Sequence, residues 1–280
     1  MRGSVPFTTS LIVFVSATGL LACEHAEFSL PSSHARSTPR APRAVAVDPA
    51  KVPSSAVFVL ADLGPERRAL VPFACWDHGH RSLAEGQACG ALVPPQATLR
   101  CVGGDPIRLG SKTPTACGDG YEVPASAASG CDVAVWVASG PSPDVILLPS
   151  IEPQTTPVER AALAKVAPAP LEIAQAITID LDGDDAKDRV YVARGAVVGA
   201  FGRAPEQLLS LHGAPEGRYR VRAVTDLDRD ALPEIWITMS LASGSGREEH
   251  LERIAPDGHV LAIATHRCRE EPPPVAEPAP

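Results

Sequence analysis

Ile177-Thr-Ile-Asp-Leu-Asp-Gly-Asp-Asp-Ala-Lys-Asp-Arg-Val-Tyr-Val192 is the stretch that decides how the second half of this chain is interpreted. A later stretch, Ala223-Val-Thr-Asp-Leu-Asp-Arg-Asp-Ala-Leu-Pro-Glu-Ile-Trp-Ile-Thr238, repeats its pattern with every acidic position displaced by 46 residues. In both stretches the acidic side chains stand between two β-prone runs. Calcium takes about six to eight oxygen ligands, and carboxylates at alternate positions of a tight loop converge on one ion. The repeat therefore predicts two calcium loops, each joining a pair of strands.

Each loop offers four carboxylates and one backbone carbonyl as ligands. Four carboxylates this close together repel one another unless a cation lies between them. The alternative is a solvated acidic turn, in which Asp side chains accept hydrogen bonds from their own backbone. The predicted ligands of the first site are Asp180, Asp182, Asp184, Asp188 and the carbonyl of Ala186, and those of the second are Asp226, Asp228, Asp230, Glu234 and the carbonyl of Leu232.

The loops are not EF-hands, because the Gly and Glu that an EF-hand needs at positions six and twelve are Asp185 and Tyr191 here. They resemble the FG-GAP/VCBS repeat of integrin-like β-propellers and many exported bacterial proteins. Its signature is Asp-x-Asp-Gly-Asp-Gly-x-x-Asp followed by a hydrophobic strand. The resemblance covers about residues 171–268 and implies that calcium holds two strands of a blade in register.

The two loops depart from that signature to different degrees. The first has Asp185 in place of a glycine, whereas the second has Arg229 and Ala231 in place of glycines and Glu234 in place of Asp. Arg229 would add a positive charge beside the ion, so we expect the second site to be the weaker one. Two repeats cannot close a propeller, which needs about four to eight blades. Either two blade-like sheets pack on the preceding module, or the chain forms one β-sandwich-like body.

The N-terminus has the pattern of an export signal. Met1-Arg-Gly-Ser is a short positive region, and Leu11-Ile-Val-Phe-Val15 opens an apolar one. Leu20-Leu-Ala-Cys23 then resembles the bacterial lipobox, which implies that residues 1–22 are removed and that Cys23 carries diacylglycerol and an acyl chain such as palmitate. An ordinary secretory signal or a retained transmembrane helix are the alternatives. Glu24 after the cysteine favours the outer membrane by resemblance to enterobacterial sorting.

The remaining six cysteines predict disulfides, because an even number in an exported chain is typical of a disulfide framework. Short loop closure favours Cys75–Cys89 and Cys117–Cys131, which leaves Cys101 for Cys268. The last bond would attach the C-terminal segment to the cysteine-rich module. No Cys-x-x-Cys spacing occurs, which argues against zinc.

The segments between the N-terminal signal, the cysteines and the acidic loops are also β-prone, so the chain is predicted to be mainly β with one short connecting helix. β-prone runs cover 56–60 and 69–76, and runs at 132–137 and 144–148 flank a Pro/Gly turn that predicts a hairpin. Thr156-Pro-Val-Glu159 is a capping box that starts a helix. The predicted organisation is a lipidated cysteine and tether (23–55), a disulfide-stapled β module (56–152), a linker with the helix (153–170), the two blade-like repeats (171–268) and a disordered tail (269–280).

The composition and the motifs of the chain reduce the number of functional classes to which it could belong. The formal charge of −8 argues against a nucleic-acid partner. His78 and His80 beside Asp77 are more typical of an exposed turn than of a metal site, and neither His-Glu-x-x-His nor Gly-x-Ser-x-Gly occurs. We therefore expect a non-enzymatic, calcium-stabilised lipoprotein of the bacterial cell envelope that offers a β-rich surface to a protein or glycan partner. The alternative is an envelope hydrolase or processing enzyme whose calcium is structural.

Overall fold

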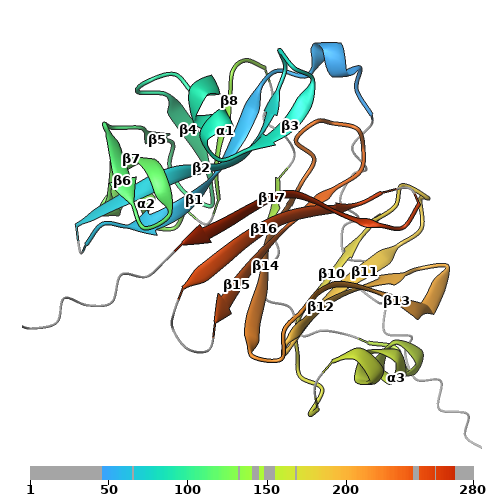
Figure 1. Ribbon diagram of the computed structural model, residues 1–280. Helices are drawn as coiled ribbons and strands as arrows, with labels where there is room; N and C mark the ends of the chain where they lie inside the picture. The colour runs from blue at the N-terminus through green and yellow to red at the C-terminus, as the bar shows by residue number, and fades with distance from the viewer. Residues whose placement is uncertain are drawn as a thin grey trace, which may run out of the picture. The chain divides into compact units, whose positions relative to one another are not determined.

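The computed structural model describes residues 46–64, 66–131, 133–140, 145–147, 155–167, 169–241, 246–255 and 257–268, all within the unit 41–280 (Figure 1). The predicted signal peptide, Cys23, the tail at 269–280 and most of the tether lie outside the described residues. Each helix among the described residues is too short or too polar to cross a membrane. Strands dominate the described residues, as the sequence predicts.

The cysteine-rich module is an eight-stranded antiparallel sheet. Its order is β5-β4-β8-β1-β2-β7-β6, with β3 paired to β2. Two short helices, α1 (Gln87–Leu92) and α2 (Ala125–Ala128), lie against β2 and β7 respectively. The strands are β1 (Ser55–Asp62), β2 (Arg67–Asp77), β3 (Ser82–Glu85), β4 (Thr98–Val102), β5 (Ile107–Arg108), β6 (Lys112–Thr115), β7 (Gly118–Pro124) and β8 (Val133–Val137).

The folded body begins before the predicted end of the tether. A 3-10 turn at Pro49–Lys51 leads into Val52, which is buried against the first sheet. The backbone N–H of Val47 donates to the carbonyl of Arg229, 2.9 Å away in the second acidic loop. The tether predicted to run to residue 55 is therefore wrong at its C-terminal end, because apolar residues in 46–55 find partners that are distant in sequence.

The two stretches that carry the acidic loops each lie in a four-stranded antiparallel meander. The first consists of β10 (Ile173–Ile179), β11 (Asp188–Ala193), β12 (Ala196–Phe201) and β13 (Ala204–Gly213). The second consists of β14 (Gly217–Thr225), β15 (Glu234–Leu241), β16 (Arg247–Ile254) and β17 (Val260–Cys268), and β9 (Val145–Leu147) pairs with its β14 edge.

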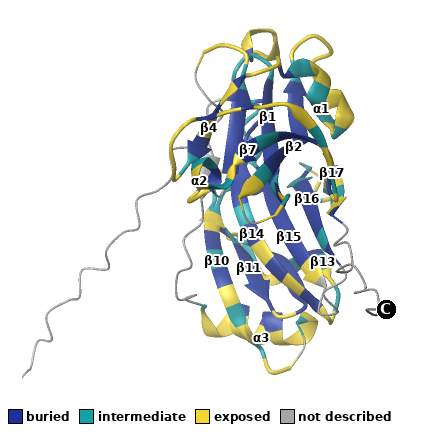
Figure 2. Ribbon diagram, turned by 90° about the vertical axis from the view of Figure 1, so that its left-hand side faces the viewer, coloured by how far each residue is buried: buried dark blue, intermediate teal, exposed yellow. Residues whose placement is uncertain are grey.

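The second meander is covered on both of its faces. Trp236 and Leu251 share a core with Phe73 of β2, whereas Ile235 and Ile237 share another with Val190 of β11. Residues next to each other along β15 thus point into different cores, as the period of two in a strand requires. Figure 2 shows β14, β15 and β16 as mostly buried strands.

The connecting helix forms as its sequence predicts. α3 (Pro157–Val166) starts with proline at its first position, and a reciprocal capping box joins Thr156 and Glu159. Their two hydrogen bonds are 2.7 Å and 3.2 Å long. Leu163 of α3 is fully buried against the first meander, so the helix covers a sheet face.

The predicted hairpin between 132–137 and 144–148 is wrong. β8 pairs with β1 and β4 in the first sheet, whereas β9 pairs with β14 in the second meander. The two segments are β-prone but belong to different sheets. Local turn chemistry cannot distinguish a hairpin from a crossover, because the choice depends on which distant strand offers an open edge.

The six described cysteines form three disulfides, and one of these bonds has the predicted partners. Cys75–Cys89 is confirmed, whereas Cys117–Cys131 and Cys101–Cys268 are wrong: the bonds are Cys101–Cys131 and Cys117–Cys268. The pairing follows the sheet, because β4 and β8 are hydrogen-bonded neighbours that place Cys101 near Cys131. The C-terminal strand is attached to the cysteine-rich module as expected, but through the cysteine between β6 and β7.

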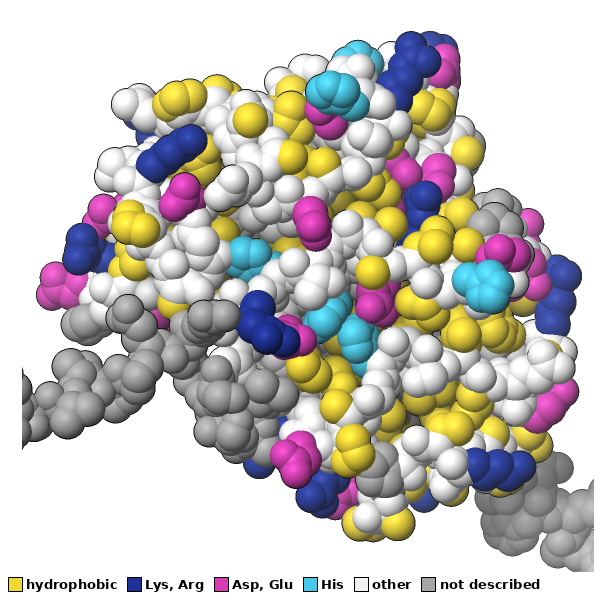
Figure 3. All heavy atoms as spheres, in the orientation of Figure 1, with side chains coloured by type: hydrophobic (Ala, Val, Ile, Leu, Met, Phe, Trp, Pro, Cys, Tyr) yellow, Lys and Arg dark blue, Asp and Glu magenta, His cyan; other side chains and the backbone are white. Residues whose placement is uncertain are grey.

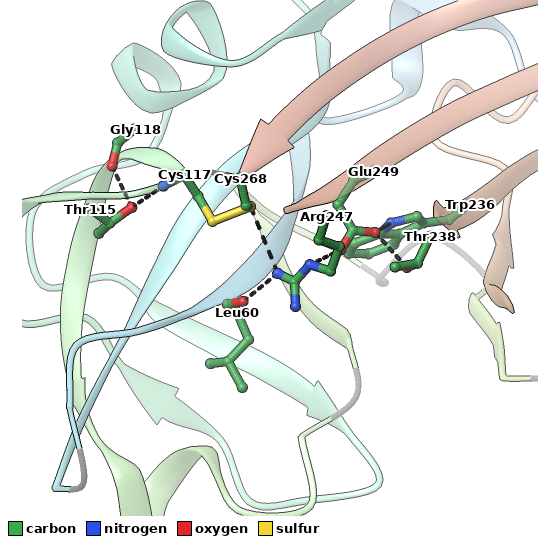
Figure 4. The surroundings of a disulfide bond; sticks show 9 residues. All are labelled: Leu60, Thr115, Cys117, Gly118, Trp236, Thr238, Arg247, Glu249 and Cys268. Carbon is green, nitrogen blue, oxygen red and sulfur yellow. Dashed lines mark hydrogen bonds and ion pairs between the residues drawn. A yellow bond between two sulfur atoms is a disulfide. The ribbon is translucent and has the colours of Figure 1, made fainter. Parts of the chain in front are cut away.

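A polar network lies beside the Cys117–Cys268 bond (Figure 4). Arg247 of β16 donates to the carbonyl of Leu60 in β1 at 2.7 Å and forms an ion pair with Glu249 at 2.8 Å. The buried Glu249 carboxylate also accepts bonds from Trp236 Nε1 and Thr238 Oγ1 at 2.8 Å and 2.6 Å. The first sheet and the second meander are therefore joined by a covalent bond, an apolar core and a charged side chain.

Candidate metal sites

The first acidic loop connects two paired strands, as the sequence predicts. Ile179, the last residue of β10, pairs with Asp188, the first residue of β11. One carboxylate oxygen from each of Asp180, Asp182, Asp184 and Asp188 lies within 4.8 Å of the others. The structure thus brings together all four predicted carboxylates. Their spacing suits a hard cation with ligands at about 2.3–2.6 Å.

Backbone N–H groups hold the carboxylates of this loop in place. Asp180 accepts bonds from the N–H groups of Gly183, Asp184 and Asp185 at 2.8, 3.1 and 3.0 Å. The N–H of Ala186, the predicted carbonyl ligand, donates to Asp184 at 2.7 Å. These bonds orient the side chains before any ion arrives, and they are also the bonds expected of a solvated acidic turn.

Asp188 is the buried member of the group. Its two oxygens accept bonds from Leu181 N and Gly202 N at 2.8 Å and 2.7 Å. A Cβ at Gly202 would lie 2.4 Å from the carbonyl oxygen of Lys187, so a glycine is needed there. Burial raises the pKa of Asp188, although the hydrogen bonds from these two N–H groups act to lower it. The structure thus adds Gly202 to the site, a residue that the loop pattern alone did not indicate.

The negative charge of the first loop is only partly compensated. Burial raises the pKa of Asp182, and the charges of Asp184 and Asp180 raise it further. Arg203 Nε lies 2.8 Å from Asp184 Oδ2, but the arginine side chain is 70% exposed. An exposed ion pair contributes little, so the loop keeps a net charge that a divalent cation would neutralise.

The second loop has the same backbone conformation despite its substitutions. Thr225 pairs with Glu234 across β14 and β15, at the place where Ile179 pairs with Asp188 in the first loop. In the first loop, Gly183 and Asp185 have φ of 78° and 65°, and the matching Arg229 and Ala231 have φ of 57° and 70°. The departures from glycine thus fall at left-handed positions, where a side chain is strained.

A guanidinium group occupies the middle of the second loop. Arg253 of β16 places Nη1 at 3.1 Å from Asp228 Oδ2, 2.9 Å from Asp230 Oδ2 and 3.9 Å from Glu234 Oε1. Three of the four predicted carboxylates thus face a cation that belongs to the protein. The weakness expected of this site has a cause besides Arg229, and nothing near the loop in sequence points to Arg253.

One arginine does not balance the four acids of this loop. Burial raises the pKa of Asp226 to about 7, with the charges of Asp228 and Asp230 adding to the effect. Burial also raises the pKa of Glu234 well above its usual range. The Leu232 N–H donates to Asp230 at 2.8 Å, as Ala186 does to Asp184. The second loop is therefore a copy of the first in which a side chain supplies part of the positive charge.

Among the described residues, two open grooves are lined by residues outside both acidic loops. The larger, of about 550 Å³, is lined by residues of both meanders, including Glu172, Arg194, Glu216, Arg218 and Tyr219. The other, of about 360 Å³, lies by Arg67 and Glu122 in the first sheet. The larger groove is within the size range of ligand pockets.

His78 and His80, which the sequence predicts to lie in an exposed turn, are both exposed. The Nδ1 atom of His80 lies 2.5 Å from Oδ2 of Asp77.

No protein-family model, no curated protein and no solved structure matches this chain.

Proposed function

We propose that the mature protein is anchored by lipid at Cys23 in the bacterial cell envelope, is stabilised by calcium, and binds a protein or glycan partner through its β-rich body. The observation that carries the calcium part is the convergence of Asp180, Asp182, Asp184 and Asp188 on one point. In this proposal the two meanders are FG-GAP/VCBS-type repeats, a resemblance supported by the equivalent registers at their loops.

The location outside the cytoplasm is supported by the three disulfides. Such bonds persist in oxidising compartments and are rare in the cytosol. Cys23 lies apart from these six cysteines in sequence, next to the residues that resemble a lipobox. Several acyl chains on one cysteine give stable membrane anchoring, which one chain alone does not.

The anchor is tested by labelling with radioactive palmitate in a bacterial host. The parent protein should carry label and fractionate with membranes, and Cys23→Ser should lose both properties. Cys75→Ser with Cys89→Ser is the matched control, since that pair forms a disulfide and should keep its label. Equal labelling of the parent and Cys23→Ser would contradict the anchor. Separation of inner and outer membranes then tests the proposed outer-membrane location.

The binding function is tested by immobilising the mature protein with calcium or with chelator and presenting envelope proteins and cell-wall glycans. Retention that needs calcium, and that Asp182→Asn with Asp184→Asn abolishes, would support it. The larger groove offers the discriminating variants, because Arg194 and Arg218 line it together with Glu172 and Glu216. Hydrolysis of an envelope polymer that Glu172→Gln or Glu216→Gln abolishes would instead support the enzyme alternative.

A further inference from the structure

Two histidines and a glutamate meet between the two meanders, away from the acidic loops. His212 lies on β13 of the first meander, and His250 and Glu252 lie on β16 of the second. One ligand atom from each of the three lies within 4.8 Å of the other two. The two imidazole rings are 4.3 Å apart between centroids, and His212 Nε2 lies 2.7 Å from Glu252 Oε1.

The alternation of β16 explains why these side chains gather. Glu248, His250 and Glu252 occupy every second position, so they point to one face of the strand. Glu249 and Leu251 point to the opposite face, toward the cysteine-rich module. The first meander contributes His212, whose ring stacks on Tyr219 of β14 in the second meander with 5.8 Å between centroids, so the cluster lies between the two sheets.

Several polar atoms of the cluster are buried without a hydrogen-bond partner among the described residues. They are His212 Nε2, His250 Nε2 and Glu252 Oε2. His250 and Glu252 are only 8% and 6% exposed. Two of these atoms have an acidic oxygen nearby: His212 Nε2 lies 2.7 Å from Glu252 Oε1, and His250 Nε2 lies 3.3 Å from Glu248 Oε2. Buried polar groups in proteins are nearly always paired, and a divalent cation that accepts a lone pair from each of the three side chains would also satisfy Glu252 Oε2, for which no partner is found among the described residues.

We propose that His212, His250 and Glu252 bind a divalent transition-metal ion of the zinc class, which ties the two meanders together. Imidazole nitrogen with carboxylate oxygen is a ligand set for zinc, whereas calcium prefers oxygen alone. Zinc holds such ligands at about 2.0–2.2 Å, which puts any two of them about 3.3–3.6 Å apart in a tetrahedral site, a separation that falls inside the 4.8 Å limit that these three atoms meet.

Three protein ligands leave a coordination position for water or for a partner's side chain. Glu248 is the nearest further acid, and it forms an ion pair with Arg267, which directs one of its oxygens away from the cluster. Figure 3 shows histidine side chains near the middle of this face of the molecule, with an acidic side chain beside them. His212 is the most exposed of the three ligands, at 18% of its side chain.

The test is zinc binding by the full mature protein with its disulfides intact and with excess calcium, which occupies the acidic loops. Calorimetry should give one zinc per chain and a raised melting temperature. His250→Gln and Glu252→Gln should each weaken binding by more than the roughly 10–100-fold that loss of a second-shell partner costs. His78→Asn with His80→Gln is the matched control, because it removes the exposed histidine pair, and it should bind zinc like the parent.

X-ray absorption of the zinc-loaded parent gives a readout that does not depend on the folding of any variant. Two imidazoles and oxygen ligands would support the proposal. A sulfur ligand would mean that the Cys117–Cys268 bond had been reduced and that the metal lies at Cys117, His266 and Cys268, which also lie within reach of one another, and it would overturn the proposal. No zinc uptake by the parent, or uptake that is lost only with His78 and His80, would leave the cluster as a His212–Glu252 ion pair and would overturn it as well.

Discussion

Arg253 Nη1 lies 2.9 Å from Asp230 Oδ2, so a side chain of β16 supplies positive charge to the second acidic loop. The same nitrogen lies 3.1 Å from Asp228 Oδ2. The first loop has no partly buried arginine of this kind among the described residues: its ion pair with Arg203 is at the surface. The two loops have the same strand register, but the negative charge of the second is partly neutralised by Arg253, whereas the first has only an exposed arginine.

Replacing Arg253 by Met should destabilise the protein in chelator. Breaking a buried pair costs roughly 3–5 kcal/mol, and because Arg253 is 21% exposed we expect about 2–3 kcal/mol. Millimolar calcium should restore more stability in Arg253→Met than it adds to the parent. Guanidinium unfolding with calcium and with chelator measures both effects. Arg203→Met is the control, with an expected loss below about 1 kcal/mol. Equal losses for the two variants would refute the assignment.

Calcium should stabilise the protein mainly through the first loop. An ion that binds only the folded state, at 100 times its dissociation constant, adds about 2.7 kcal/mol. Asp182→Asn with Asp184→Asn should keep the turn and remove most of this response. The same pair of changes at Asp228 and Asp230 should have a smaller effect, because Arg253 already bonds both carboxylates. The measurement is the melting temperature with and without calcium. An unchanged midpoint in the parent would reduce both loops to acidic turns.

The second loop should make stability in chelator fall as the pH rises toward neutrality. Burial raises the pKa of Asp226 from 3.8 to about 7, so the folded state holds this proton more tightly than the unfolded state. The stabilisation is complete below the unfolded pKa and is lost as the pH rises through the folded one. Asp226→Asn should flatten the curve between about pH 4 and 7. The measurement is the free energy of unfolding of the parent and of Asp226→Asn over this pH range. Parallel curves for the two proteins would contradict the prediction.

The Cys117–Cys268 bond should contribute more stability than Cys75–Cys89. The sequence separations are 151 and 14 residues, and chain entropy then gives about 5 and about 3 kcal/mol. Replacing each pair by alanine and comparing guanidinium midpoints measures the difference. The parent should show no free thiol among the six cysteines without reduction. Midpoints in the reverse order would show that native packing, rather than loop closure, dominates.

The carboxylates of the acidic loops were predictable because their spacing and most of their backbone hydrogen bonds are local. Asp180 bonds the N–H groups of residues three to five positions ahead, and the β-prone runs on either side pair directly. The capping box at Thr156 and the Cys75–Cys89 bond are local in the same sense. What failed involves distant partners: the strands at 133–137 and 145–147 joined different sheets.

Sequence alone thus determined the loop carboxylates, the mainly β class and the helix start, because short-range spacing and alternation specify them. Only the tertiary structure decided that Arg253 enters the second loop, that Cys117 pairs with Cys268, and that His212 meets His250. The two contacts of Cys117 and His212 form where different sheets pack on one another, and Arg253 reaches the loop from a neighbouring strand of the same sheet. Which side chains meet depends on the order of the strands and on which sheet edges are open. Neither can be predicted from the residues that are close in sequence.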